Sequence, residues 1–266
     1  MNLLHSFGVQ PLYVVSGLLV GALVGLTGVG GGSLMTPLLI LMFGVHPSTA
    51  VGTDLLYAAV TKAVGTGVHS SGKSVEWRIV GLLALGSVPA TGMVILLLAH
   101  FGAASPVVSR LISLTLGVAL LISAVLLVLR GPIIRAATKR NPDFGLHTSA
   151  RLTIVTGFVV GALVSLSSVG AGALGTIALM FLYPRLPTVK IVGTDIAHAV
   201  PLALLAGLGH WWLGSINMEL LGSLLVGSIP GIVAGSFLAR VMPEGALRPA
   251  LAAVLALVGV KMLTVA

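Results

Sequence analysis

The fold is decided by the stretch GLTGVGGGSLMTPLLILMFGVHPSTAVGTDL, residues 25–55. Its glycine-rich break is followed by an apolar segment at residues 33–43, which is too short to cross a bilayer upright, because a spanning helix needs ~20 residues. Together with the apolar residues 12–28, this segment predicts either a re-entrant hairpin or a broken pair of helices. Either form returns the chain to the side of the membrane from which it started.

The second half of the chain repeats this stretch. SLSSVGAGA at 165–173 corresponds to GLTGVGGGS at 25–33, and VGTDI at 192–196 corresponds to VGTDL at 51–55. Further matches follow in the same order along both halves: GALV at 21–24 and 161–164, His69 and His210, and GSVP at 86–89 with GSIP at 227–230. Matches in one consistent order indicate an internal duplication.

The duplication divides the chain into a first repeat at residues 1–129, a basic linker at 130–150 and a second repeat at 151–266. Each repeat contains the broken or re-entrant pair and then three long apolar segments. Three crossings after a returning pair bring the first repeat out on the opposite side of the membrane. We therefore predict that the two repeats have inverted topology.

The composition indicates a lipid environment. Of the 266 residues, 57% are hydrophobic and only 8% are charged, and the mean hydropathy is +1.15, far from the values of a soluble domain. Runs such as Trp77–Ala99 and Val107–Leu129 are long enough to span the hydrocarbon core as helices and lack the alternation of outer-membrane strands. We predict an all-α polytopic membrane protein of the cell inner or plasma membrane.

The basic residues predict the orientation of the chain. With the 130–150 linker in the cytoplasm, the cytoplasmic segments hold most of the 14 Lys and Arg residues. These are Lys73, Arg78, Arg130, Arg135, Lys139, Arg140, Arg151, Arg185, Lys190, Arg240 and Arg248. This bias follows the positive-inside rule and places both termini outside. It also explains the net charge of +8 without a nucleic-acid partner.

The glycine-rich breaks are the first candidate site. A helix that starts after such a break directs unpaired N–H groups and a positive dipole end toward an anion, and broken helices of inverted repeats bind substrates in transporters. The candidate substrate-binding residues are Thr27, Gly30, Gly31, Gly32 and Ser33 in the first repeat, and Ser167, Ser168, Gly170, Ala171 and Gly172 in the second. The alternative is close helix packing through small residues.

The stretch at 25–55, with SLSSVGAGA and VGTDI in the second half, resembles the TauE/SafE family of sulfite-exporter-like membrane proteins over essentially the whole chain. The resemblance implies a secondary transporter, often an exporter, of a small sulfur-containing anion such as sulfite, sulfoacetate or a related sulfonate. The two breaks differ, since Ser168 and Ala171 stand where the first repeat has Gly28 and Gly31. We therefore expect the second break to be stiffer than the first.

Asp54 and Asp195 are repeat-related acids, and His198 lies one turn after Asp195. An acid inside a membrane marks a functional site, so we expect these three residues to couple protons to anion movement. The alternative reading is an acid at the start of a helix that stabilises the helix dipole. For His198 the alternative is an interior histidine with a satisfied hydrogen bond.

Lys62 has no counterpart in the second repeat, where the corresponding residue is Ala203. It lies two turns beyond Asp54 on the same helix, ~12 Å along the axis, which places it near the centre of the membrane. A charge there must face a cavity or pair with another charge. Lys62 is predicted to attract the anionic substrate, and the alternative is a structural ion pair with an aspartate.

Two other functional classes use some of the same residues. An anion channel has no coupling to a gradient, and an intramembrane aspartyl protease needs two carboxylates that share a proton. We expect neither enzymatic activity nor catalytic residues, and no cofactor or metal site. The expected partners are a small anion, protons and the lipid bilayer, and the oligomeric state cannot be read from the sequence.

Overall fold

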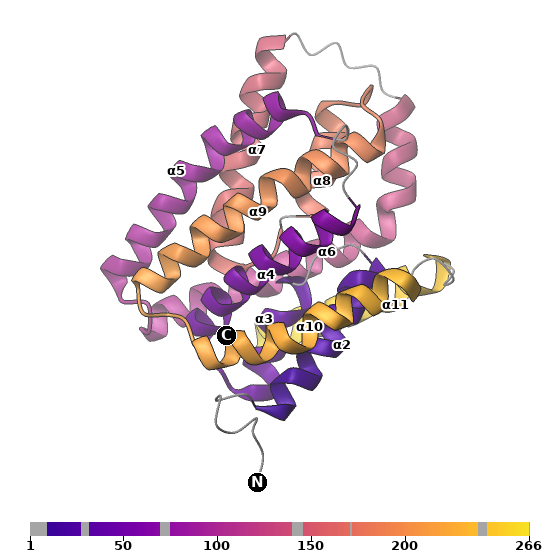
Figure 1. Ribbon diagram of the computed structural model, residues 1–266. Coiled ribbons are helices and arrows are strands. Elements are labelled where there is room, and N and C mark those ends of the chain that lie inside the picture. The colour runs from indigo at the N-terminus through magenta and orange to yellow at the C-terminus, as the bar shows by residue number, and fades with distance from the viewer. Residues whose placement is uncertain are drawn as a thin grey trace.

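The computed structural model describes residues 10–27, 32–69, 75–139, 146–170, 172–238 and 244–265, which form helices joined by short connections (Figure 1). The helices of the first half are α2 (Pro11–Thr27), α3 (Gly32–Phe43), α4 (Pro47–His69), α5 (Trp77–Phe101) and α6 (Pro106–Lys139). Those of the second half are α7 (Leu146–Ser167), α8 (Ala173–Leu182), α9 (Thr188–Trp212), α10 (Met218–Leu238) and α11 (Glu244–Val265). The described residues contain no strand, and the predicted all-α class is confirmed.

Both halves show the same order of helices. An apolar helix is followed after a break by a short one, α3 with 12 residues and α8 with 10 residues, and three longer helices come next. Neither short helix is long enough to cross the hydrocarbon core upright. The inverted orientation of the two repeats stays a prediction.

Five of the described helices are long and apolar enough to cross a membrane. They are α5, α6 over Pro106–Leu129, α7 over Thr148–Ser167, α9 and α10. Large apolar side chains are exposed along these helices, for example Leu85 and Leu96 of α5, at 64% and 65%. Such surfaces suit contact with lipid tails, and the chain is a multi-pass membrane protein.

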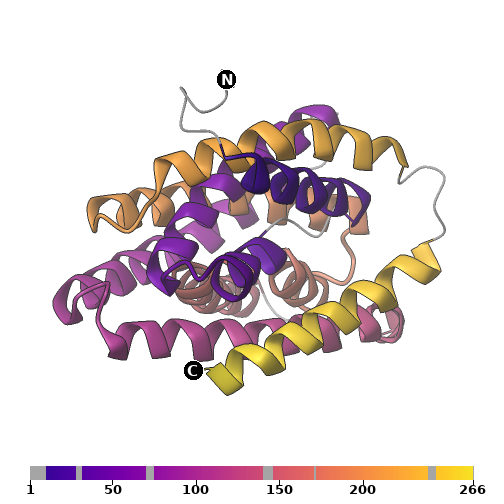
Figure 2. The same ribbon diagram turned by 90° about the horizontal axis from the view of Figure 1, so that it is seen from below.

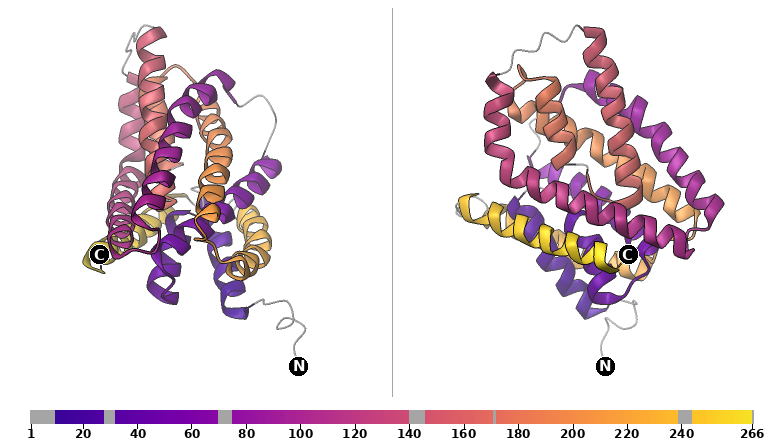
Figure 3. Two further views of the ribbon diagram at one scale, coloured as in Figure 1. Left: turned by 90° about the vertical axis from the view of Figure 1, so that its left-hand side faces the viewer. Right: turned by 180° about the vertical axis from the view of Figure 1, so that it is seen from behind.

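Each half supplies partners for the other. Helix α2 packs along α10, and the corresponding second-half helix α7 packs along α5 (Figure 2). The remaining long helices pair with their own counterparts: α4 contacts α9, and α6 runs beside α11 (Figure 3). The two halves are therefore interlocked.

Glycines allow the exchanged helices to approach closely. A Cβ atom built on Gly227 of α10 would lie 1.9 Å from the carbonyl oxygen of Val14, and one on Gly86 of α5 would lie 1.9 Å from that of Ile154. These contacts are repeat-related, because GSIP and GSVP begin at Gly227 and Gly86. Small residues let backbones touch in membranes, where helices associate by close packing.

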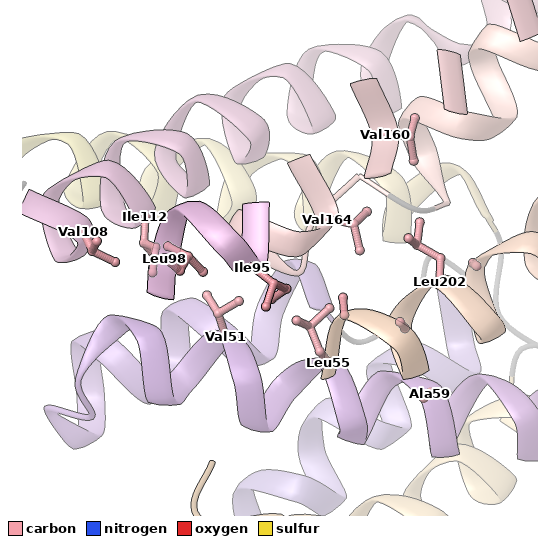
Figure 4. Close-up of a cluster of buried hydrophobic side chains, with 13 residues drawn as sticks. Val51, Leu55, Ala59, Ile95, Leu98, Val108, Ile112, Val160, Val164 and Leu202 are labelled. Carbon is pink, nitrogen blue, oxygen red and sulfur yellow. The ribbon is translucent and has the colours of Figure 1, made fainter. Parts of the chain in front are cut away.

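A layer of buried apolar side chains lies along one face of the middle of α4 (Figure 4). Val51, Leu55 and Ala59 share one face of this helix and pack against α5, α6, α7 and α9. Another face of α4 is also buried but carries the polar residues Asp54 and Tyr57. The packing therefore places polar groups inside the helix bundle, where they need partners other than water.

Candidate functional site

The break between α7 and α8 has an unusual backbone. Ser168 has a φ angle of 58°, Gly170 of 122° and Gly172 of 127°, in the region that favours glycine. The break falls where the sequence predicts it, since α7 ends at Ser167 and α8 begins at Ala173. Ser168 holds a less favourable conformation than a glycine would, so the surrounding packing must maintain it.

Among the other predicted residues of the breaks, Ser167 has a described environment. The Ser167 hydroxyl donates to the carbonyl oxygen of Leu163 at 2.7 Å and accepts from the N–H of Val169 at 3.3 Å, so it serves its own helix end. The side chains of Thr27, Gly32 and Ser33 lie outside the described part of the chain, as do the whole residues Gly30, Gly31 and Ala171.

Each repeat aspartate is bound by a threonine from the short helix of its own half. The Thr36 hydroxyl of α3 donates to Asp54 Oδ2 of α4. Its counterpart Thr176 of α8 donates to Asp195 Oδ2 of α9 at 3.0 Å. Asp54 and Asp195 are both buried, with 0% and 2% of their surface exposed. The two acids are thus interior groups joined to the short helices.

Neither aspartate caps its helix. Helix α4 begins at Pro47 and α9 begins at Thr188, so both acids lie about two turns inside their helices, and the first turns contain no acid. The alternative reading of Asp54 and Asp195 as acids at helix starts is therefore wrong. Each carboxylate has its own threonine partner, which is unlike the shared proton of an aspartyl protease dyad.

Lys62 connects the two acids electrostatically. Its ammonium group interacts most strongly with Asp195 and also with Asp54, and its charge acts on His198 as well. The side chain is half-buried. The structure therefore brings together four residues that the sequence singled out, Asp54, Lys62, Asp195 and His198, from the two central helices α4 and α9.

One turn after each aspartate, a side chain faces a serine of the other half. His198 Nε2 lies 2.8 Å from the Ser87 Oγ of α5. The repeat-related residues are Tyr57 and Ser228 of α10, and these two side chains also interact. The alternative interpretation of His198 was an interior histidine with a satisfied hydrogen bond. The structure shows such a bond, between His198 and Ser87.

Ser168 lies at the aspartate of the other half. Its side chain interacts with the carboxylate of Asp54, although the break belongs to the second half. Neither Ser168 Oγ nor Asp54 Oδ1 has a hydrogen-bond partner of normal geometry among the described residues. The second break and the first aspartate therefore form one site.

The threonine of each VGTD motif anchors the start of a helix from the other half. The Thr194 hydroxyl accepts the N–H of Glu76 before α5 at 2.9 Å, and the Thr53 hydroxyl accepts the N–H of Asn217 before α10 at 3.2 Å. A salt bridge of 2.6 Å between Lys190 and Glu76 is added at the first of these contacts. These bonds fix α5 and α10 beside the aspartates.

Sequence reasoning missed several residues of this site: Thr36, Tyr57, Ser87, Thr176 and Ser228. The repeat carried a signal for them, because LMT and LGT follow the two breaks and GSVP and GSIP occur in both halves. The described residues contain no group of three or more His, Cys, Asp or Glu side chains suited to a metal ion.

The fold and this site define a polytopic helical membrane protein with ionisable residues buried between two interlocked halves. The family described as "Sulfite exporter TauE/SafE" matches residues 13–262. The chain therefore belongs to this family, which confirms the resemblance seen in the sequence.

Relatives cover nearly the whole chain. The "Probable membrane transporter protein YjnA" of Bacillus subtilis is 39% identical over 254 residues, which are 94% of this chain and 98% of the relative. The "Probable membrane transporter protein YdhB" of the same organism is 29% identical over 247 residues, 92% and 96% of the two chains. A "Probable membrane transporter protein" of Xylella fastidiosa strain Temecula1 is 31% identical over 246 residues, 87% and 86%. No solved structure matches the chain.

Proposed function

We propose that this protein is a secondary transporter that exports a small sulfur-containing anion, such as sulfite, sulfoacetate or a related sulfonate, in exchange with or together with protons. The family description names sulfite export, and the relatives are named probable membrane transporters. These names support transport as the class of function and an anion of sulfur as the class of substrate.

The observation that carries the proposal is the cluster of the buried Asp54 and Asp195 with the half-buried Lys62. Ionisable groups inside a membrane protein are costly and mark the paths of ions and substrates. Because the cluster joins α4 of one half to α9 of the other, a relative movement of the halves changes its electrostatics. That is the property which a coupled transporter requires.

Lys62 provides the positive charge for the anion in this proposal. A compact ammonium group binds an oxyanion as a point charge, and it is held near the second break, whose Ser168 interacts with Asp54. The substrate then lies between the breaks at residues 27–33 and 167–172. Asp54, Asp195 and His198 supply the groups that take up and release protons.

Uptake into proteoliposomes tests the class and the substrate together. Purified protein is assayed with a panel of small anions, sulfite and sulfoacetate included, with and without an imposed pH gradient. Accumulation of one anion that depends on the gradient is the expected result. Flux that only dissipates the anion gradient would instead assign the protein to the channels.

The Lys62→Met variant tests the role of the positive charge. Loss of the charge is expected to weaken the apparent affinity for the anion by about tenfold, equivalent to about 1.4 kcal/mol. The Lys62→Arg variant keeps the charge and serves as the matched control, with a smaller loss. An unchanged affinity in Lys62→Met, in protein of normal stability, would remove Lys62 from the substrate site.

The orientation in the membrane is part of the proposal, with a cytoplasmic linker at 130–150 and both termini outside. A cysteine introduced as Ala266→Cys is expected to react with an impermeant maleimide in cells whose inner membrane is intact and accessible. The chain has no native cysteine, so the label reports one position. A matched cysteine at Ala137 of the linker should react only after the membrane is opened, and the reverse pattern would contradict this topology.

A further inference from the structure

Four buried polar atoms of Asp54 and of side chains linked to it lack a hydrogen-bond partner of normal geometry among the described residues. They are Asp54 Oδ1, Tyr57 Oη, Ser168 Oγ and Ser228 Oγ. Their side chains are at most 7% exposed. The side chains of Ser168 and Asp54 interact, as do those of Tyr57 and Ser228, and Tyr57 also lies within the electrostatic reach of Asp54. Unsatisfied groups in such number at one place point to a ligand.

The corresponding place in the second half is satisfied. There, Ser87 and His198 bind each other at 2.8 Å, and Thr176 binds Asp195 at 3.0 Å. None of these four residues contributes an unpartnered buried atom among the described residues. Lys62 also interacts more strongly with Asp195 than with Asp54. The need for a ligand is therefore confined to the Asp54 side.

The charges of the cluster define the ligand. Two aspartates and one lysine, all ionised, carry one surplus negative charge, and its position is the carboxylate that Lys62 engages less. A buried charge must be balanced. A water molecule satisfies hydrogen bonds but balances no charge, and an anion is repelled as long as the surplus negative charge is unbalanced. A proton balances the charge but gives no new partner to the hydroxyl oxygens of Tyr57, Ser168 and Ser228.

We propose that Asp54 Oδ1, Tyr57 Oη, Ser168 Oγ and Ser228 Oγ form a binding site for one sodium ion. A hard cation prefers carboxylate and hydroxyl oxygens, and a single positive charge balances the cluster. Space is limited, because a Cβ atom built on Gly21 of α2 would lie 2.5 Å from the carbonyl oxygen of Ser228. Tight packing of α2 against α10 favours sodium over the larger potassium ion.

Sodium and a proton compete for Asp54 at this site. The titratable groups that face it are Tyr57 and Lys62 on its own helix, and Asp195 and His198 are linked to it through Lys62. Acid therefore weakens sodium binding. The inference rests on the proposed transport function only for the role of the ion in coupling, because binding itself is measured without transport.

The test is sodium binding to the purified protein in detergent. Binding is measured directly with radioactive sodium. Stabilisation is measured by thermal unfolding in sodium, potassium or choline chloride at equal ionic strength. Stabilisation and binding specific to sodium, weakening as the pH falls, are expected. Ser228→Ala and Tyr57→Phe should each weaken sodium binding by about tenfold, and Asp54→Asn should abolish it. Ser123→Ala, at a buried serine of α6 outside the site, is the control and should keep the wild-type sodium affinity.

The inference is overturned if sodium stabilises the protein no more than choline, or if Ser123→Ala and Ser228→Ala weaken sodium binding equally. Its failure differs from that of the proposed function. If a pH gradient drives anion accumulation in sodium-free buffer and no sodium binds, the proposed transport function stands and the sodium site is wrong. Specific sodium binding without flux of any tested anion would support the sodium site and contradict the proposed anionic substrate.

Discussion

The two aspartate clusters share a frame and differ in their content. Both contain a threonine from the short helix, an aspartate on a central helix, a side chain one turn later and a serine from the other half. Tyr57 occupies in one cluster the position that His198 occupies in the other. Of the two clusters, only that of Asp54 has buried polar atoms without partners among the described residues.

The short helices add a second difference. A Cβ atom built on Gly175 of α8 would lie 2.0 Å from Asp195 Oδ1, so this glycine makes room for the carboxylate. The repeat-related position in α3 is Met35, which is buried. The two halves thus share a backbone frame, and differences within it give the two clusters different side-chain contacts.

The glycine contacts that build the frame predict the largest effect. Gly227→Ala must push α2 and α10 apart, because the new Cβ meets the backbone of Val14, and we expect a loss of about 3 kcal/mol of stability or more. Gly222→Ala is the matched control on the same helix, since a Cβ there has nothing within 4 Å. Thermal unfolding and the yield of monodisperse protein measure both. Equal stability of the two variants would refute the close contact.

Neutralising each aspartate in turn separates the clusters. Asp54→Asn is expected to reduce gradient-driven anion accumulation about 100-fold while exchange of the anion across the membrane continues, because the coupling cation loses its carboxylate. Asp195→Asn removes the stronger partner of Lys62, so it should change anion affinity as well as weaken proton coupling. Accumulation and exchange assays on both variants measure these two effects separately. A coupling defect in Asp195→Asn alone would reverse the assignment.

The smallest effect concerns the anchors beside the clusters. Glu76 and Lys190 form a salt bridge at Thr194, whereas the corresponding anchor at Thr53 has Asn217 and Thr49 and no such pair. The pair is partly exposed, so Glu76→Gln should cost less than about 1 kcal/mol in thermal unfolding. The backbone bond from residue 76 to Thr194 remains in this variant. A loss as large as that of Gly227→Ala would show that the salt bridge holds the halves together.

The sequence was sufficient to predict the helices and the breaks, because length, apolar runs and glycines act locally. It also singled out Asp54, Lys62, Asp195 and His198, since charged groups inside apolar segments are conspicuous. It did not show that Ser168 of one half reaches Asp54 of the other, or that Tyr57 faces Ser228. The contact of Tyr57 with Ser228 depends on the placement of α10 beside the first half, and that of Ser168 with Asp54 on the packing of α4 against the second half. A comparison of one repeat with the other does not reveal either arrangement.

The placement of α10 beside α2 sets the order of events during biosynthesis. Helix α2 leaves the ribosome long before its partner α10, which is complete only after Leu238 has been added. Until then, the glycine-rich face of α2 has lipid or the insertion machinery as its neighbour. Helix α2 can therefore reach its final position only after α10 has been synthesised.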